Sequence, residues 1–568
     1  MSVRGSPAAC AAAGDEVEET AEELLARVSG MVPAALSGAT TAVGFPGRWK
    51  AISKKLGTLP AHLSDLSSHP CFARNALCRE LLQSVAATLA DSAELAAQPP
   101  GAGKLLMQSA IDALAGRLDV NLRDCSLLVR TGVLSDASTA VPTTTTIPAA
   151  AQADVRELLA RLQIGHGDAK GRAVEGLLDA LDRDDKSVVS ALGRANVAAL
   201  VQLLTAPAPA VREKAAAVVC RLAESGTCEG MLVSEGALPP LIRLAECGLA
   251  GREKAVVALR RLSASPEAAR AVAAHGGART LVEICRPQGD SVSQSAAAGA
   301  LRNLSASPEA HHALADEGIV PVMVGLLNSG AVLAGAKEHA AECLRNLTSD
   351  TGGDIFRHAV ASDGALRSLL LYLDAPSPQE SAVIALRNVV GAVSPDALVS
   401  LGVLPRLAHA LRAGTTGAQL AAAEAIWKIS SGGGGSGRDM KRLVGEHGCV
   451  PLLVRMLEAK SSGTREVAAQ ALASLAAHPG NAREVRRDER SVPSLVQLLD
   501  PSPGNTAKTH AIACLLALSS AKRCKRLMIS HGAIGYLKKL TDMEVTGAGM
   551  LLERLEERGT LRSIFSKN

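Results

Sequence analysis

The stretch Ala300-Leu301-Arg302-Asn303-Leu304 decides the fold, because near copies of it recur along the chain. Cys343-Leu344-Arg345-Asn346-Leu347 and Ala385-Leu386-Arg387-Asn388-Val389 follow it, and weaker copies extend the series in both directions. The apolar residues that close the copies are Leu181, Leu222, Leu262, Leu304, Leu347, Val389, Ile429, Leu475 and Leu518. Successive closing residues are 40 to 46 positions apart, and a period of this size indicates a stacked array of helical units.

A second marker repeats in the same frame, namely a glycine followed by an apolar run that often contains proline. Gly318-Ile319-Val320-Pro321 and Gly402-Val403-Leu404-Pro405 are two examples. Glycine ends a helix at a left-handed position, and proline fits the first turn of the next helix. The two markers predict units of one short and two longer helices. About nine units cover residues 153–531, a helical cap completes the array to residue 558, and residues 559–568 form a tail.

Residues 15–134 do not share this period. Apolar stripes at helical spacing cover residues 16–29, 48–66, 71–97 and 104–129, which predicts four helices packed as an antiparallel bundle. Pro60 should kink or split the second helix. Residues 1–14 are predicted to be disordered, and the polar, Pro-bracketed residues 135–152 to form a flexible linker. The predicted fold class is therefore all-α, an N-terminal four-helix bundle followed by an α-solenoid over residues 153–558.

The composition excludes several classes of function. The 60 Lys and Arg residues against 56 Asp and Glu residues leave a net charge of only +4, too little to indicate a strongly charged partner. None of the twelve cysteines forms a C-x-x-C pair, and Cys220, Cys343 and Cys514 fall on apolar helix faces. That pattern favours buried thiols in a reducing compartment. With no secretory signal and no long apolar run, we expect a cytoplasmic protein, with the nucleus as a second location.

No group of residues points to catalysis, a metal or a cofactor. No Cys/His set has the spacing of zinc ligands, and His311-His312 is not part of a His-Glu-x-x-His motif. The glycine-rich residues 432–437 lack the Lys and Ser/Thr of a phosphate loop and follow a helix, so we predict a flexible insertion. The basic run 521–526 lacks aromatic neighbours and is interpreted as a solvated turn, with a nuclear-localisation signal or an anionic-membrane contact as alternatives.

The repeating unit resembles the armadillo repeat, with its Gly-x-Ile/Leu-Pro opening and its Ala-Leu-x-Asn-Leu third helix. The resemblance implies a right-handed superhelix whose third helices line a concave groove. Residues 16–134 are similar to the helical N-terminal domain of plant U-box/armadillo proteins. Residues 135–150 stand where those relatives carry the U-box, and they lack its Cys-Pro-Ile core. The chain thus resembles plant armadillo proteins without the ligase module.

In the armadillo family, the third-helix Asn binds the backbone of an extended peptide, since an amide offers both a donor and an acceptor. The resemblance carries this role to a row of candidate groove residues: Arg221, Arg261, Asn303, Asn346, Asn388 and Lys428. The alternative is that these are ordinary solvated residues. The cations flanking the asparagines favour an acidic or mixed-charge segment. Nuclear-import receptors carry Trp four residues before the Asn, where this chain has Gly299, Glu342 and Ile384. Their absence argues against basic localisation peptides as ligands.

These observations predict a non-catalytic scaffold or adaptor that binds extended or helical segments of other proteins. One alternative is a ubiquitin-pathway adaptor without ligase activity, and another is a membrane-peripheral trafficking adaptor. Neither a small-molecule substrate nor nucleic acid is expected. The scaffold hypothesis predicts that replacing Asn303 and Asn346 by Ala lowers partner affinity without lowering the melting temperature.

Overall fold

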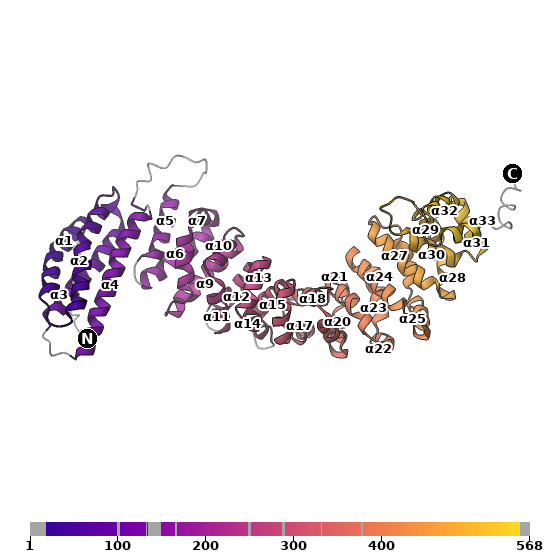
Figure 1. Cartoon of the computed structure of the whole chain (residues 1–568), viewed down its shortest axis with the longest axis horizontal. Coiled ribbons are helices and arrows are strands. Elements are labelled where there is room, and N and C mark those ends of the chain that lie inside the picture. The colour runs from indigo at the N-terminus through magenta and orange to yellow at the C-terminus, as the bar shows by residue number, and fades with distance from the viewer. Residues whose placement is uncertain are drawn as a thin grey trace, which may run out of the picture. The chain divides into compact units, whose positions relative to one another are not determined.

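The computed structural model describes residues 19–98, 103–131, 133–134, 149–164, 167–247, 251–286, 290–330, 332–376, 379–432 and 434–556. Within these ranges the regular secondary structure is helical and no strand occurs, as Figure 1 shows. The chain divides into two compact units, residues 1–240 with 249–254 and residues 241–248 with 255–568. The predicted disordered residues 1–14, the tail 559–568 and most of the predicted linker lie outside the described residues.

The first unit begins with a four-helix bundle, as the sequence predicted. Its elements are α1 (Ala21–Thr41), α2 (Pro46–Ser67), the 3-10 turn η1 (Phe72–Arg74), α3 (Ala76–Ala97) and α4 (Lys104–Arg130). Helix α1 packs on α2 and α3, and helix α4 packs on the same two helices. The four apolar stripes therefore meet in one core. Thr20 and Glu23 form a reciprocal capping box that starts α1.

The prediction that Pro60 interrupts the second helix is wrong. Helix α2 runs unbroken from Pro46 to Ser67 with Pro60 inside it. Pro60 is exposed, whereas Leu56, Leu59 and Leu63 around it are buried. Proline removes one backbone hydrogen bond, but packing of the apolar face supplies most of the stability of a helix in a folded protein. The buried stripe therefore holds α2 together across the proline.

The bundle continues directly into the first helices of the repeat region. Helix α5 (Ala149–Gln163) includes the last four residues of the predicted linker, 149–152. Ala160 and Ile164 belong to the same buried core as the bundle. Helix α6 (Gly167–Arg183) then packs on α5. The bundle is therefore one side of a shared core within the first unit.

The remaining helices that begin in the first unit belong to the repeats. They are α7 (Asp185–Ala191), α8 (Arg194–Leu203), α9 (Pro209–Glu224), α10 (Glu229–Ser234), α11 (Leu238–Glu246) and α12 (Arg252–Leu262). The ends of α11 and α12 pass into the second unit.

The second unit contains the rest of the array. Its first group of elements comprises α13 (Pro266–Ala274), α14 (Gly277–Ile284), α15 (Ser291–Ser305), η3 (Pro308–Ala310), α16 (His311–Asp316), α17 (Ile319–Asn328), α18 (Ala334–Leu347), α19 (Asp354–Ala361), α20 (Asp363–Tyr372) and α21 (Glu380–Val389). Its second group comprises η4 (Val390–Ala392), α22 (Pro395–Ser400), α23 (Val403–Ala413), α24 (Thr416–Ser430), α25 (Gly434–Glu446), α26 (Cys449–Met456), α27 (Ser462–Ala476), α28 (Pro479–Arg487), α29 (Ser491–Gln497), α30 (Lys508–Leu518), α31 (Lys522–Ser530), α32 (Ala533–Asp542) and α33 (Ala548–Glu556).

The two sequence markers fall where the repeat frame requires them. All nine closing residues lie in the last turn of a helix, namely α6, α9, α12, α15, α18, α21, α24, α27 and α30. Left-handed backbone occurs at Gly236, Gly318, Gly402, Gly448 and Gly532. Gly276, which precedes α14, also has left-handed backbone, with φ of 78°. The chain is an all-α helical-repeat solenoid.

The glycine-rich residues 432–437 are not wholly the insertion that was predicted, because α25 begins at Gly434. Met440 and Val444 of the same helix are buried. Glycine disfavours a helix interior by about 1 kcal/mol relative to alanine. We infer that the buried residues of α25 offset this penalty at its start.

Candidate functional site

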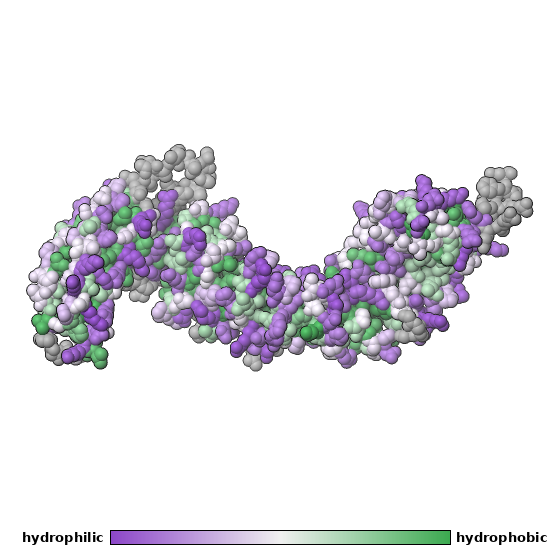
Figure 2. Space-filling view, viewed as in Figure 1, coloured by the Kyte–Doolittle hydropathy of each residue, from purple (hydrophilic) through white to green (hydrophobic). Residues whose placement is uncertain are grey.

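The third helices of successive repeats form the surface on which the candidate residues lie. In the second unit α15 packs on α18, α18 on α21, α21 on α24, and α24 on α27. Asn303, Asn346, Asn388 and Lys428 occupy the same position near the ends of α15, α18, α21 and α24. In Figure 2, hydrophilic side chains cover much of the face over α13 to α21.

The three asparagine amides bond backward to the preceding third helix. Asn303 donates from Nδ2 to the Arg260 carbonyl at 3.0 Å and to Ser263 Oγ at 3.0 Å. Asn346 makes the same pair of bonds to Arg302 and Ser305, and Asn388 to Arg345 and Thr348. Their four distances are 3.2, 3.1, 3.5 and 3.2 Å. Each amide therefore adds a second bond to a carbonyl at the end of a helix, where the carbonyl also accepts the hydroxyl of Ser263, Ser305 or Thr348.

The acceptor side of each amide is occupied as well. Arg302 donates to Asn303 Oδ1 from Nε at 3.2 Å and from Nη2 at 2.9 Å. Arg345 and Arg387 fork in the same way onto Asn346 and Asn388. An amide has two donor hydrogens and two acceptor lone pairs, so all four positions are engaged. The amides therefore join neighbouring repeats, so we now expect their replacement to lower stability, while peptide binding by this row stays a prediction.

Two further residues of the row bond backward in a similar way. Lys428 Nζ donates to the Arg387 carbonyl at 3.4 Å, and burial lowers the pKa of Lys428, with nearby Arg387 adding to the effect. Ser474 Oγ donates to the Ser430 carbonyl at 3.0 Å. The row position therefore links adjacent third helices even where Asn is replaced.

Arg221 and Arg261, the remaining candidates, differ in their contacts. Arg221 of the first unit forms ion pairs with Asp182 at 3.2 Å and Glu224 at 3.6 Å. Arg261 of the second unit is exposed, and no residue in the described part of the chain forms an ion pair with it. Arg261 is thus the cation of the row with the greatest capacity for a new partner.

The arginine that precedes each Asn was missed by the sequence analysis. Arg302 Nη1 pairs with Glu342 at 3.0 Å, and Arg387 Nη1 pairs with Glu424 at 2.6 Å. All four side chains are about one-third exposed, from 27% to 35%. The signal was present in the sequence, because Arg precedes Asn in all three strong copies. It was missed because only the Asn position was followed from repeat to repeat.

A cavity of about 290 Å³ opens on this row. It is lined by Ser263, Ala264, Pro266, Arg302, Asn303, Ala306, Ser307, Glu342, Arg345 and Asn346. Because these residues come from the ends of α12, α15 and α18 and the turns after them, the cavity lies between consecutive repeats. It brings together two of the predicted candidates, Asn303 and Asn346.

Gly299 shapes the same surface one turn earlier. A Cβ atom at Gly299 would lie 2.7 Å from Arg260 Cδ and 3.1 Å from His339 Cδ2, so only glycine leaves room for both side chains. His339 is half-buried, and burial lowers its pKa, with the nearby charge of Arg302 acting in the same direction. This position cannot hold the aromatic residue of nuclear-import receptors without displacing Arg260 and His339.

The three cysteines that the repeat pattern placed on apolar helix faces are buried. Burial raises the pKa of Cys220 to about 11 and the pKa values of Cys343 and Cys514 to about 12. At neutral pH these thiols are protonated and are poor nucleophiles. In the described ranges, no cluster of three or more His, Cys, Asp or Glu side chains is arranged to hold a metal. No described helix is both long and apolar enough to cross a bilayer.

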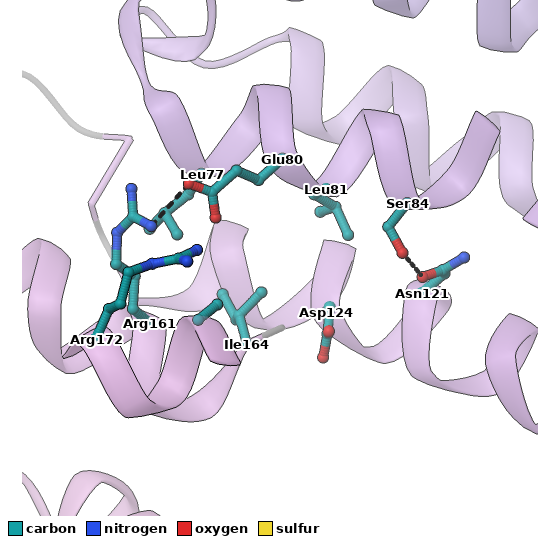
Figure 3. Close-up of a pocket in the computed structure, with 10 residues that line it drawn as sticks. Leu77, Glu80, Leu81, Ser84, Asn121, Asp124, Arg161, Ile164 and Arg172 are labelled. Atoms are coloured by element: carbon teal, nitrogen blue, oxygen red, sulfur yellow. Dashed lines mark hydrogen bonds and ion pairs between the residues drawn. The ribbon is translucent and has the colours of Figure 1, made fainter. Parts of the chain in front are cut away.

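A second cavity, of about 210 Å³, lies in the first unit between the bundle and α5 and α6. Figure 3 shows Glu80 of α3 paired with Arg161 of α5, at 2.8 Å. Arg161 also pairs with Glu157 of its own helix at 3.0 Å. Asp124 lies on α4 at this cavity and is 3% exposed at its side chain. These contacts join the bundle to the first repeat helices.

Comparison with known proteins supports the repeat frame. An Armadillo/beta-catenin-like repeat model matches residues 437–477, which extend from within α25 through α27. A model described as a domain of unknown function (DUF7032) matches residues 26–133, which is most of the bundle. Among solved structures, the chain is similar to an engineered protein from a structural genomics consortium. The two are 27% identical with a TM-score of 0.60, over 72% of this chain and 100% of that one. No curated protein matches the sequence.

Together the repeat match and the structural likeness identify an armadillo-type helical-repeat architecture with a distinct N-terminal helical domain. Folds of this type are typically non-catalytic and generally bind other proteins. The resemblance to plant U-box/armadillo proteins remains a prediction.

Proposed function

We propose that this protein is a non-catalytic scaffold that binds segments of partner proteins along its third helices. The observation that carries the proposal is the cavity between Asn303 and Asn346, in a row where cations outnumber carboxylates. In the second unit, the row residues and the residues directly before them include six cations: Arg260, Arg261, Arg302, Arg345, Arg387 and Lys428. The carboxylates four residues before the row are Glu342 and Glu424. This excess favours acidic segments.

A pair of matched charge reversals tests this surface. Arg261 lies on the third helix α12 and Arg279 on the second helix α14, and both are exposed. Proximity labelling with the full chain first defines its partners. Arg261→Glu should then reduce recovery of those partners several-fold, whereas Arg279→Glu should leave recovery unchanged. Equal recovery with both variants, or equal loss, would place the binding surface elsewhere.

The scaffold is expected to work in the cytoplasm, with the nucleus as a second location. Imaging of the full chain fused to a fluorescent protein tests this, and a signal confined to another organelle would contradict it. A ubiquitin-pathway adaptor remains the alternative suggested by the resemblance of the N-terminal bundle. Autoubiquitination by the isolated protein would overturn the expectation that it lacks ligase activity.

One feature favours the membrane-peripheral alternative as a second function. Leu105 and Leu106 at the start of α4 are 82% and 75% exposed, and Val43 between α1 and α2 is 70% exposed. Contact between Arg48 of α2 and Asp112 of α4 places these segments at the same end of the bundle. Apolar side chains are visible at the end of the bundle drawn lowest in Figure 2. Liposome co-sedimentation with Leu105→Ser/Leu106→Ser tests this surface, and unchanged sedimentation would exclude it.

A further inference from the structure

The arginines that precede two of the row asparagines, Arg302 and Arg387, show the same arrangement. The guanidinium of Arg302 holds Asn303 Oδ1 with Nε and Nη2 and directs Nη1 to Glu342 of the next repeat. Arg387 does the same with Asn388 and Glu424. In both cases the carboxylate stands four residues before the next row position, Asn346 or Lys428. One edge of each guanidinium therefore fixes its orientation, and the other edge meets an anion.

Arg345 lies between these two and lacks the carboxylate. Its Nε and Nη2 hold Asn346 Oδ1 at 3.3 and 3.1 Å, so its guanidinium has the same orientation. The equivalent position, four residues before Asn388, is Ile384. Within the described residues, no Asp or Glu forms an ion pair with Arg345. The sequence position that supplies the carboxylate to Arg302 and Arg387 is therefore apolar in the repeat after Arg345.

The surroundings of Arg345 suit a bound anion. Arg345 is half-buried and lines the cavity of about 290 Å³ together with Ser307 and Asn346. A guanidinium already fixed by other hydrogen bonds loses little freedom when it binds an anion, and its planar edge matches a carboxylate or phosphate. Glu342 also lines the cavity, but it is paired with Arg302. The cavity is therefore lined by an oriented guanidinium that has no carboxylate partner among the described residues.

We propose that Arg345 binds an anionic side chain of a partner segment that lies along the third helices. The proposal rests on the proposed scaffold function and names the chemistry that this part of the groove recognises. The anion takes the place that Glu342 and Glu424 fill for Arg302 and Arg387. A carboxylate and a phosphorylated side chain share this chemistry, and the test includes both sources.

The test uses the full chain and three fluorescein-labelled peptides of equal length: octaglutamate, a peptide alternating phosphoserine with glutamine, and octaglutamine. Fluorescence anisotropy at physiological salt should show binding of at least one anionic peptide and no binding of octaglutamine. Tighter binding of octaglutamate identifies a carboxylate as the preferred group, and tighter binding of the other anionic peptide identifies a phosphate. Failure of both anionic peptides to bind would overturn the proposal.

The decisive variant is Ile384→Glu, which restores the missing carboxylate beside Arg345. We expect it to lower the affinity for the anionic peptide about ten-fold or more, because the internal glutamate occupies the guanidinium. Ile384→Gln is the uncharged control and should bind within about two-fold of the unmodified protein. Equal affinities for Ile384→Glu and Ile384→Gln would overturn the proposal.

Arg345→Gln and Arg387→Gln provide a second comparison that does not alter Ile384. Arg345→Gln should lower the affinity as Ile384→Glu does. Arg387→Gln should have a smaller effect, since Glu424 already occupies that guanidinium. Equal losses for the two variants would contradict a specific role for Arg345.

The outcomes separate this proposal from the scaffold function. Loss of partners with Arg261→Glu, together with unchanged peptide binding by Ile384→Glu, would leave the scaffold in place and remove the Arg345 site. Unchanged partner recovery with Arg261→Glu, together with the expected peptide results, would leave an anion site without the scaffold role.

Discussion

Replacing Asn346 by Ala should loosen the junction between two repeats, because this amide joins α18 to α15. The substitution removes the bonds from Asn346 Nδ2 to the Arg302 carbonyl at 3.2 Å and to Ser305 Oγ at 3.1 Å. It also removes the acceptor for Arg345, whose two bonds measure 3.3 and 3.1 Å. The Arg302 carbonyl at the end of α15 then keeps only the bond from Ser305 Oγ, at 2.7 Å.

The magnitude follows from these four bonds. A protein hydrogen bond contributes about 0.5–1.5 kcal/mol net, and half-exposed bonds of this length belong at the lower end of that range. The sum is about 2 kcal/mol, which corresponds to a roughly thirtyfold change in an equilibrium constant. In a repeat array such a loss acts on the junction between neighbours, so it should appear locally.

Native-state hydrogen exchange is the assay that resolves this effect. Amides of α15 and α18 that exchange through local opening should exchange about thirtyfold faster in Asn346→Ala, while those of α1 to α4 should not change. Asn346→Asp keeps an acceptor for Arg345 but loses both donated bonds, so it separates the two halves of the interaction. Unchanged protection in α15 and α18 would refute the reasoning. It would also favour the sequence-based expectation that replacing this Asn leaves the melting temperature unchanged.

Three further predictions concern stability. Leu304→Ala should cost about 2–5 kcal/mol, because Leu304 is fully buried, and a urea denaturation midpoint near that of the unmodified protein would contradict it. Gly448→Ala should cost about 1–2 kcal/mol, since φ is 72° there, whereas the helical Gly463→Ala, which has open space around it, should be neutral or stabilising in thermal denaturation. The pKa of His339 is lowered in the folded protein, so the neutral imidazole favours the folded state. This contribution to the free energy of unfolding is present above the pKa that His339 has in the unfolded chain. It is lost as the pH falls through the lowered pKa of the folded protein. His339→Gln should therefore lose less stability than the unmodified protein between pH 7.5 and pH 5.5, and equal losses in urea denaturation would contradict this.

The recurrence of one short motif was enough to predict the repeat frame. Each closing residue, from Leu181 to Leu518, lies in the last turn of a helix, because a buried position of a stacked unit must recur with the period of the stack. The bundle was predictable for a similar local reason, since its apolar stripes follow helical spacing. The split at Pro60 was predicted wrongly, because the stability that α2 gains from burial of Leu56 and Leu63 does not appear in the local rule for proline.

The candidate site was only partly predictable. The sequence by itself determined which positions share a face, because equivalent residues of a periodic helix recur in a fixed frame. It placed Asn303, Asn346 and Asn388 in one row. Only the tertiary structure decided what those amides do. Their partners lie 40 to 44 residues away, on the preceding third helix. A hydrogen bond across that separation depends on how two helices pack, and no local pattern specifies it. The same packing distinguishes Arg345 from Arg302 and Arg387, since it determines which side chain of the next repeat meets each guanidinium.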